Sequence, residues 1–148
     1  MSEYDLAHRV GREMFARDPA SQAMGMTLLE IAPGSARLRM PVREDMLNGH
    51  GTCHGGIIFT FADSAFAFAC NARNEVTVAQ GAQISFVRPA RGGDVLEAHA
   101  AEVTRAGRTG VYDVEVRDQK GHLIALFRGN SYRLQGHVVP VEGEASAK

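Results

Sequence analysis

The chain has 148 residues, which suits a single domain large enough to bury a hydrophobic core. Apolar residues make up 45% and charged residues 22% of it, the balance of a soluble globular protein. Its 16 basic and 17 acidic residues give a formal charge of −1, which offers no electrostatic case for nucleic-acid binding. Two cysteines are too few for a disulfide framework, and no apolar run reaches the length of a membrane span. Without a basic-then-apolar leader pattern at the start, we expect a cytoplasmic protein with no membrane partner.

The first third of the chain is predicted to form one helix and two strands. Apolar residues at four-residue spacing indicate the helix, and Asp18-Pro19 ends it. Alternating Leu and Arg residues indicate a half-buried strand after Pro33-Gly34. The predicted elements are a helix over Asp5–Ala16, a helical turn over Ala20–Gly25, and strands over Thr27–Ala32 and Ser35–Val42.

A Gly-rich loop, Arg43–Gly55, leads into the longest predicted helix, Gly56–Ala72. This helix is apolar on nearly all sides, so we expect it to be buried rather than to lie on the surface. The period then changes to alternating and β-branched residues, with a hairpin signal at residues 118–121. These patterns predict four strands, over Val76–Val87, Val95–Thr104, Gly110–Arg117 and Leu123–Arg133.

Strands gathered around one buried helix predict an α+β domain with an antiparallel sheet. We expect this domain to span residues 1–135. Residues 136–148 carry no large apolar side chain beyond a few valines and are expected to form a frayed or disordered tail.

One carboxylate conflicts with its surroundings. Asp63 lies in the predicted buried helix among four phenylalanines, where an unpaired charge is costly. Desolvation there should raise the pKa of Asp63 and make it a better base. A structural acid that caps or pairs with another group explains the same pattern, and on composition alone the two explanations are equally good.

The loop before this helix carries polar groups that could bind a substrate or position a reacting water. The backbone N–H groups of a first helical turn are unpaired and lie at the positive end of the helix dipole, so Gly55 and Gly56 can offer donors at close range. Asn48 can orient a water or a substrate, although Asn-Gly also suits a plain turn. His54 is equally well explained as a substrate contact or as a structural loop residue.

Three segments together resemble a known family. L-N-G-H-G-T-C-H-G-G followed by F-A-D-S-A-F-A-F-A-C-N is similar to the signature of the acyl-CoA thioesterases of the PaaI type, named for phenylacetic acid degradation. I-S-F-V-R-P-A-R-G-G-D and R-T-G-V-Y-D-V-E-V, with A-L-F-R-G-N-S-Y-R, agree with it. The resemblance spans residues 5–134 and implies the hotdog fold, in which an antiparallel sheet wraps around one long central helix.

The resemblance also implies roles. It makes Asp63 the general base or a nucleophile, Gly55 the donor to the thioester oxygen, and Asn48 with His54 the positioning groups. In the family the Asn and the acid come from different subunits. The implied substrate is a (hydroxy)phenylacetyl-CoA-like or other aryl or medium-chain acyl-CoA. No metal is implied, and no cofactor beyond the coenzyme A of the substrate.

Further residues are candidates for substrate binding. Thr60 shares a helix face with Asp63 and is placed to bond its carboxylate, whereas a helical serine such as Ser64 more often only packs. The phosphates of CoA need cations, and the arginines that fall within the family segments rank first, although each one taken singly is better explained as a solvated surface charge. Phe59, Phe66 and the N-terminal helix are expected to line the acyl pocket. The candidates are Gly56, Thr60, Ser64, Arg88 and Arg128.

Hotdog domains pair their sheets edge to edge, and Val111–Val116 and Ile84–Val87 are the expected edges. The resemblance therefore implies a homodimer and favours a homotetramer built as a dimer of dimers. Two other functions remain open: an enoyl-CoA hydratase or dehydratase on the same fold, and a non-catalytic acyl-CoA-binding module.

Overall fold

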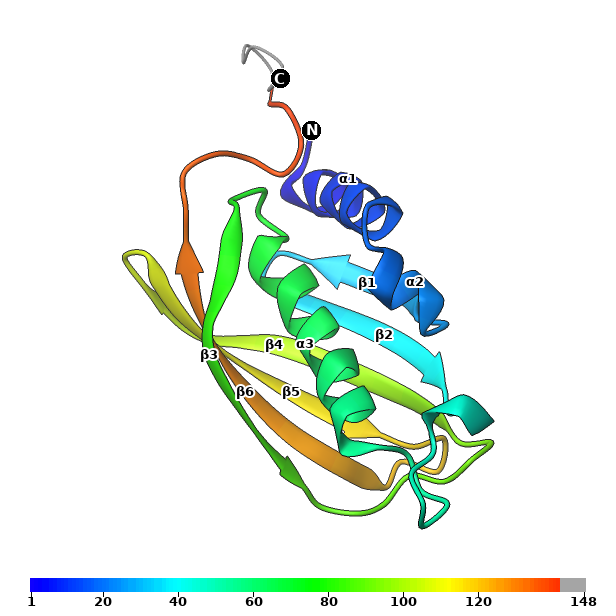
Figure 1. Ribbon diagram of the computed structural model, residues 1–148. Coiled ribbons are helices and arrows are strands. Elements are labelled where there is room, and N and C mark those ends of the chain that lie inside the picture. Colours follow the sequence, from blue (N-terminus) through cyan, green and yellow to red (C-terminus); the bar gives the residue numbers. More distant parts are fainter. Residues whose placement is uncertain (142–148) are drawn as a thin grey trace.

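A long helix, α3 (Gly55–Asn71), packs across one face of a six-stranded sheet in the computed structural model, which describes residues 1–141 (Figure 1). The strands lie in the order β1-β2-β4-β5-β6-β3, and every neighbouring pair is antiparallel. The predicted α+β architecture, a sheet wrapped around one helix, is confirmed. The strands are β1 (Thr27–Ala32), β2 (Ser35–Pro41), β3 (Thr77–Phe86), β4 (Val95–Ala106), β5 (Thr109–Arg117) and β6 (Leu123–Arg133).

The helix α3 is buried as its composition predicts. Phe61 and Phe68 are fully enclosed, because the sheet covers most of the helix surface. A stripe of half-buried residues, at spacings of three to four, runs along the part that the sheet does not fully cover. The stripe consists of Phe59, Thr60, Asp63 and Ala67.

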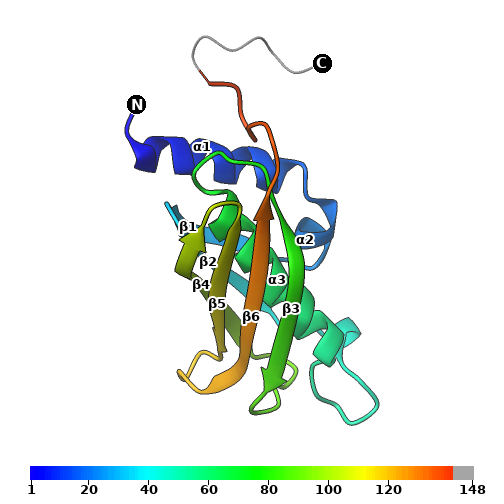
Figure 2. The same cartoon turned by 90° about the vertical axis from the view of Figure 1, so that its left-hand side faces the viewer.

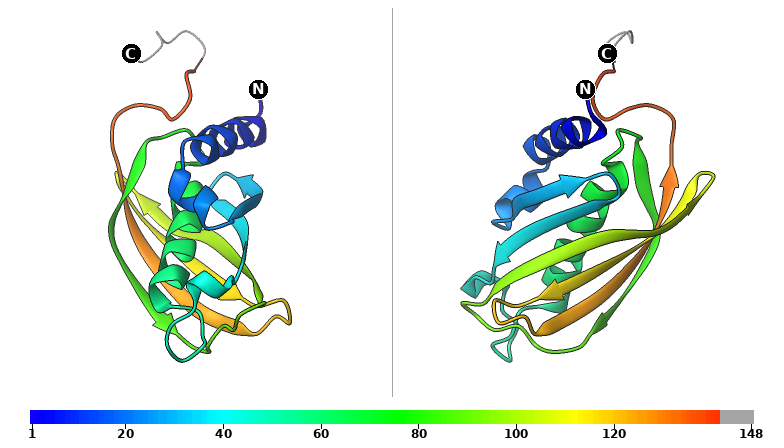
Figure 3. Two further views of the ribbon diagram at one scale, coloured as in Figure 1. Left: turned by 45° about the vertical axis from the view of Figure 1, so that its right-hand side comes forward. Right: turned by 180° about the vertical axis from the view of Figure 1, so that it is seen from behind.

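Two further helices lie beside the edge strand β1, α1 (Glu3–Ala16) at the opposite end of α3 from its N-terminus and α2 (Pro19–Ala23) alongside the middle of α3 (Figures 1 and 3). α1 begins earlier than predicted, because Ser2 and Asp5 form a capping box. It packs closely on β1, where a methyl group at Gly11 would lie 2.9 Å from Leu28 Cδ2. The short α2 is capped by Asp18.

The two edges of the sheet are β1 and β3, so Ile84–Val87 is confirmed as part of an edge. The other expected edge is wrong. Val111–Val116 lies in β5, which is hydrogen-bonded to β4 on one side and β6 on the other. Its alternating apolar pattern reflects burial against α3 rather than an open edge. In contrast, most of β3 is exposed on both of its faces. Figure 2 shows it beside β6 at the edge of the sheet.

The chain does not fray at Gly136. The buried Asn74, which has a left-handed backbone conformation with φ of 67°, holds the last described segment in place. Its Oδ1 accepts from the Val139 N–H at 2.8 Å, and its Nδ2 donates to the Val139 carbonyl at 2.9 Å. Val139 is buried. The rest of the predicted tail, residues 142–148, lies outside the described residues.

Candidate active site

Asn48 organises the loop that precedes α3. Its side-chain Oδ1 accepts from His50 N–H at 2.9 Å, from Thr52 N–H at 3.2 Å and from the Thr52 hydroxyl at 3.3 Å. These bonds hold the loop in an Asx-type turn. The Nδ2 amide of Asn48 donates to no residue within 1–141, so its two hydrogens are available to a bound molecule.

His54 is the N-cap of α3. Its Nδ1 accepts from the Gly56 N–H at 3.2 Å, and its carbonyl oxygen accepts from the N–H groups of Ile57 and Ile58. An accepting Nδ1 places the proton of the neutral ring on Nε2. His54 therefore satisfies the helix terminus, and the predicted substrate donor Gly56 has its N–H already bonded.

Gly55 is the exception in this first turn. Its backbone N–H makes no hydrogen bond to any described residue, although it lies at the positive end of the α3 dipole. Gly55 lines a cavity of about 290 Å³ between α3 and the end of β3. The ring of Phe86 covers it so closely that a methyl group at Gly55 would lie 3.1 Å from Phe86 Cζ. The lining residues are Thr52, Cys53, Gly55, Ile58, Phe86, Val87, Arg88 and Pro89.

Asp63 lies two turns further along α3, in the half-buried stripe. Burial raises the pKa of its carboxyl above the ordinary value of 3.8, and no described side chain offsets this by a hydrogen bond or an opposite charge. The structural alternative of a capped or ion-paired acid therefore has no partner within residues 1–141. Asp63 does not line the cavity at Gly55.

The two hydroxyl groups near Asp63 are used elsewhere. Thr60 Oγ1 donates to the Gly56 carbonyl at 2.9 Å, so its hydrogen does not reach the Asp63 carboxylate. The buried Ser64 faces α2, where its Oγ lies 2.8 Å from Ser21 Oγ. Because the Ser21 hydroxyl donates to Asp18, the shared hydrogen comes from Ser64. Ser64 therefore joins two helices.

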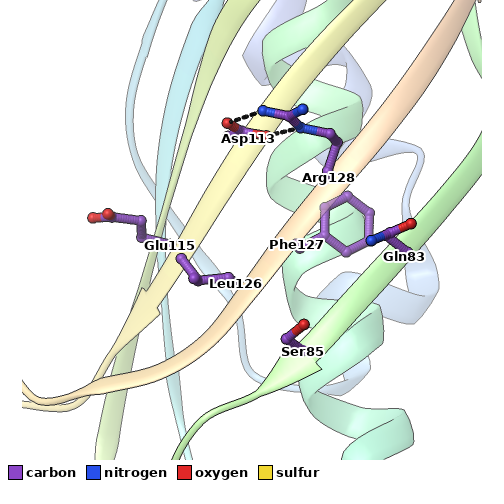
Figure 4. A pocket seen from close by; sticks show the side chains of 7 residues that line it. All are labelled: Gln83, Ser85, Asp113, Glu115, Leu126, Phe127 and Arg128. Atoms are coloured by element: carbon purple, nitrogen blue, oxygen red, sulfur yellow. Dashed lines mark hydrogen bonds and ion pairs between the residues drawn. The ribbon is translucent and has the colours of Figure 1, made fainter.

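The two arginines ranked for phosphate binding lie in different places. Arg88 is exposed at the mouth of the cavity lined by Gly55. Arg128 lies on the face of the sheet away from α3 and makes a two-point ion pair with Asp113, at 2.6 and 2.8 Å (Figure 4). This pair lowers the pKa of Asp113. The hollow around it shares no lining residue with the cavity at Gly55.

The groups expected to line an acyl pocket are spread along α3. Phe66 is buried in the core, where its ring packs on Tyr112 and Phe127 with centroids 5.6 and 5.8 Å apart. Phe59 is half-buried and contacts Phe127 edge to face. The N-terminal helix α1 lies at the other end of α3, where Phe15 packs near Phe68. The apolar wall beside Gly55 comes instead from Phe86, which sequence reasoning did not single out; an exposed aromatic ending an edge strand was the available signal.

The cysteines are poorly suited to nucleophilic catalysis. Burial raises the pKa of Cys53 to about 11 and that of Cys70 to about 12, which keeps both thiols protonated at neutral pH. Across residues 1–141 there is no group of three or more His, Cys, Asp or Glu placed to hold a metal ion. In the same part of the chain, no helix combines the length and apolar character needed to cross a bilayer.

Comparison with known proteins places the chain in a family. The sequence profile of the thioesterase superfamily matches residues 50–125. Over 132 residues the chain is 42% identical to the acyl-coenzyme A thioesterase PaaI of Escherichia coli K12, covering 89% of this chain and 92% of that protein. The chain therefore belongs to the thioesterase superfamily and has its hotdog fold.

Within that superfamily the chain is similar to PaaI in structure as well. The structure of E. coli PaaI, from the phenylacetic acid degradation operon, has a TM-score of 0.90 at 40% identity, covering 92% of this chain and 99% of that one. The TT0310 protein of Thermus thermophilus has a TM-score of 0.77 at 46% identity, covering 80% and 99%. A Streptococcus mutans protein bound to acetyl CoA, with a TM-score of 0.73 at 22% identity over 76% and 90%, shares the fold.

Proposed function

We propose that this chain is an acyl-CoA thioesterase that hydrolyses a thioester to a carboxylic acid and coenzyme A. One observation carries the mechanism: the helix α3 of each copy offers an unpaired N–H at its positive end, in Gly55, and an unpaired acid of raised pKa, in Asp63. Membership of the thioesterase superfamily and the similarity to E. coli PaaI support the same activity.

The proposed reaction needs three events at one carbonyl carbon. Asp63, as general base, removes a proton from water as the water attacks the thioester carbon. The developing oxyanion accepts a hydrogen bond from Gly55 N–H, and the Nδ2 amide of Asn48 positions the water or the thioester. The intermediate collapses with loss of the CoA thiolate, which takes up a proton. No step requires a metal or a further cofactor, and dialysis against a chelator should leave the rate unchanged.

The proposed site is shared by two copies of the chain. Gly55 and Asp63 are separated along the helix by about 12 Å, given a rise of about 1.5 Å per residue. That separation, and the position of Asp63 outside the cavity lined by Gly55, favour a site in which Gly55 and Asn48 of one subunit meet Asp63 of the other.

The edge strand β3 is the proposed contact between the two copies. Over its ten residues, β3 carries no charged side chain and exposes Val78 by 43% and Phe86 by 55%, which is an edge without the usual protection against pairing. We propose β3-to-β3 pairing, and a homotetramer as a dimer of such dimers. Light scattering that shows a monomer at micromolar concentration would contradict this assembly.

For the acyl group we propose phenylacetyl or hydroxyphenylacetyl, because PaaI of E. coli is encoded in the phenylacetic acid degradation operon. We also propose the cytoplasm as the compartment, where the two free cysteines would stay reduced. A panel of acyl-CoA thioesters and fractionation of cells test these two points separately.

The decisive test of the mechanism is Asp63→Asn, assayed with phenylacetyl-CoA and a thiol reagent. Loss of the base should lower kcat by about 100-fold or more while the fold is retained. Asp5→Asn is the matched control, since Asp5 lies at the far N-terminus of α1 and is exposed. A folded Asp63→Asn variant with most of its activity would overturn the assignment.

Two alternative functions predict different results in these assays. Hydration of an enoyl-CoA would consume substrate without releasing a free thiol, so product analysis separates it from hydrolysis. A non-catalytic acyl-CoA-binding module would show a rise in melting temperature with CoA but no turnover. The unpaired acid of raised pKa favours hydrolysis over the binding module.

A further inference from the structure

A second, polar hollow adjoins the cavity at Gly55. It has a volume of about 330 Å³ and lies between the connection that follows β3 and the hairpin that joins β5 to β6. Both segments lie at the same end of the molecule as the N-terminus of α3 (Figures 1 and 2). Arg88 and Pro89 line both the hollow and the cavity, so the two spaces are contiguous.

The hollow contains two acids, and both are occupied by hydrogen bonds within its own wall. Asp94 accepts from Arg91 N–H at 2.8 Å and from Gln119 Nε2 at 3.0 Å. Asp118 accepts from the N–H groups of Lys120 and His122, each at 2.9 Å, and its other oxygen lies 3.1 Å from His122 Nδ1. The acids therefore shape the two turns and form no ion pair with Arg88, Arg91 or Lys120, although each keeps its negative charge.

The cations of the hollow are left without partners. The side chains of Arg88, Arg91 and Lys120 enter no ion pair and no hydrogen bond with any of residues 1–141, although all three line this one space. Most arginines elsewhere in the described chain are paired, as Arg128 is with Asp113. Three cations against two acids leave the hollow with a net positive charge, and the three unpaired cationic side chains form a site for phosphate groups.

From this arrangement we infer that Arg88, Arg91 and Lys120 bind the phosphate groups of the coenzyme A moiety, an inference that rests on the proposed function. The cavity offers an apolar wall and the Gly55 N–H to the thioester, and the adjoining hollow offers positive charge to the phosphates. Arg88, at the boundary, contacts the part of the ligand that joins them. Arg91 and Lys120 thereby replace Arg128 as the partners of Arg88 expected for the phosphates.

The test compares two substrates with the same thioester. One is phenylacetyl-CoA, and the other is the phenylacetyl thioester of N-acetylcysteamine, which has no phosphate. The variants Arg91→Ala, Lys120→Ala and the double variant should raise KM for the CoA substrate by about ten-fold for each cation removed, with kcat unchanged. Their kcat/KM for the N-acetylcysteamine thioester should equal that of the wild type. The KM for the CoA substrate should also rise with salt in the wild type and less so in the double variant.

Arg39→Ala is the matched control, because Arg39 is also exposed and outside any ion pair of the described residues, but it lies on β2 away from the hollow. It should leave both substrates unaffected. A double variant whose KM for phenylacetyl-CoA stays within about two-fold of the wild type would overturn the phosphate site. An equal loss on both substrates would overturn it too, because the residues would then act on the thioester. Failure of the proposed function is distinct, since the wild type would then hydrolyse neither substrate.

Discussion

At the scale of single residues, the burial of Asp63 has an energetic consequence. Because burial raises its pKa, the folded chain holds this proton more tightly than the unfolded chain does. The contribution of Asp63 to stability is therefore fully present below the ordinary pKa of 3.8 and is lost as pH rises through the raised pKa of the folded state. At neutral pH the ionised acid is a cost.

We therefore expect Asp63→Asn to increase the free energy of unfolding at neutral pH while it lowers activity. The difference from the wild type should shrink as the pH falls below 3.8, where both chains carry a neutral side chain. Urea unfolding of the variant and the wild type, from neutral pH to below 3.8, measures this difference in the free energy of unfolding. A variant less stable than the wild type at neutral pH would show that the carboxylate has gained a partner in the assembled protein.

Gly129 on β6 leaves room for the ring of the core residue Phe66, because glycine has no side chain. A Cβ atom there would lie 2.8 Å from two atoms of the Phe66 ring. Gly129→Ala should lower the free energy of unfolding by about 1–3 kcal/mol, the usual cost of overpacking. Gly49→Ala is the control, since a Cβ at Gly49 meets nothing within 4 Å. Denaturant titrations that rank the two variants equally would contradict the packing argument.

At the scale of elements, α2 is joined to α3 by two linked hydrogen bonds, from the Ser64 hydroxyl to Ser21 Oγ and from the Ser21 hydroxyl to the Asp18 carboxylate. Ser21→Ala should cost about 1–3 kcal/mol, because it leaves the buried Ser64 hydroxyl without a partner. Adding Ser64→Ala should recover part of that loss. A double-mutant cycle on unfolding free energies gives the coupling, and strictly additive losses would mean that the two hydroxyls do not interact.

The sequence predicted most elements well because their signals are local. The strand Leu123–Arg133 has the bounds predicted from its alternation, and α3 begins and ends within one residue of its prediction. The prediction that failed depends on which strands pair, and strand pairing is a non-local property. Alternation in Val111–Val116 indicates burial on one face but not which strands lie beside it, so an interior strand was expected at the edge.

The same limit applies to the site. Composition made Asp63, Gly55 and Gly56 candidates, since an acid in an apolar helix and glycines at a helix start are visible in one segment, and the family resemblance then selected Asp63 and Gly55. It could not show that Arg128 pairs with Asp113 across two strands, or that Lys120 of a hairpin lies near Arg88. It also could not decide the role of His54, which depends on a hydrogen bond to Gly56 N–H.

At the scale of the whole molecule, the shared site predicts complementation between two inactive variants. Asp63→Asn removes the base, and Asn48→Asp removes the free amide hydrogens while keeping the Oδ1 that holds the loop. In a mixed dimer one of the two sites combines an intact Asp63 with an intact Asn48. Random reassembly of equal amounts should restore about a quarter of wild-type activity, from half the dimers with one working site each.

Co-expression or joint refolding of the two chains, followed by a thiol-release assay, measures this recovery. Each variant refolded alone is the control and should stay inactive. No recovery from a mixture shown to contain mixed dimers would place all the catalytic groups within one subunit.

The two hydrogen bonds between the Asn74 side chain and the Val139 backbone, here called the clasp, determine where the folded domain ends. A chain cut after residue 135, the boundary predicted from composition, would leave the buried amide of Asn74 without either of its backbone partners. The truncated chain should unfold at a lower denaturant concentration than a chain cut after Val141. Its free energy of unfolding should be smaller because two buried hydrogen bonds are lost, at about 1–3 kcal/mol each. Equal midpoints would contradict it. The minimal autonomous unit is thus defined by an asparagine near the middle of the sequence, and a fusion partner would be joined safely only beyond the clasp.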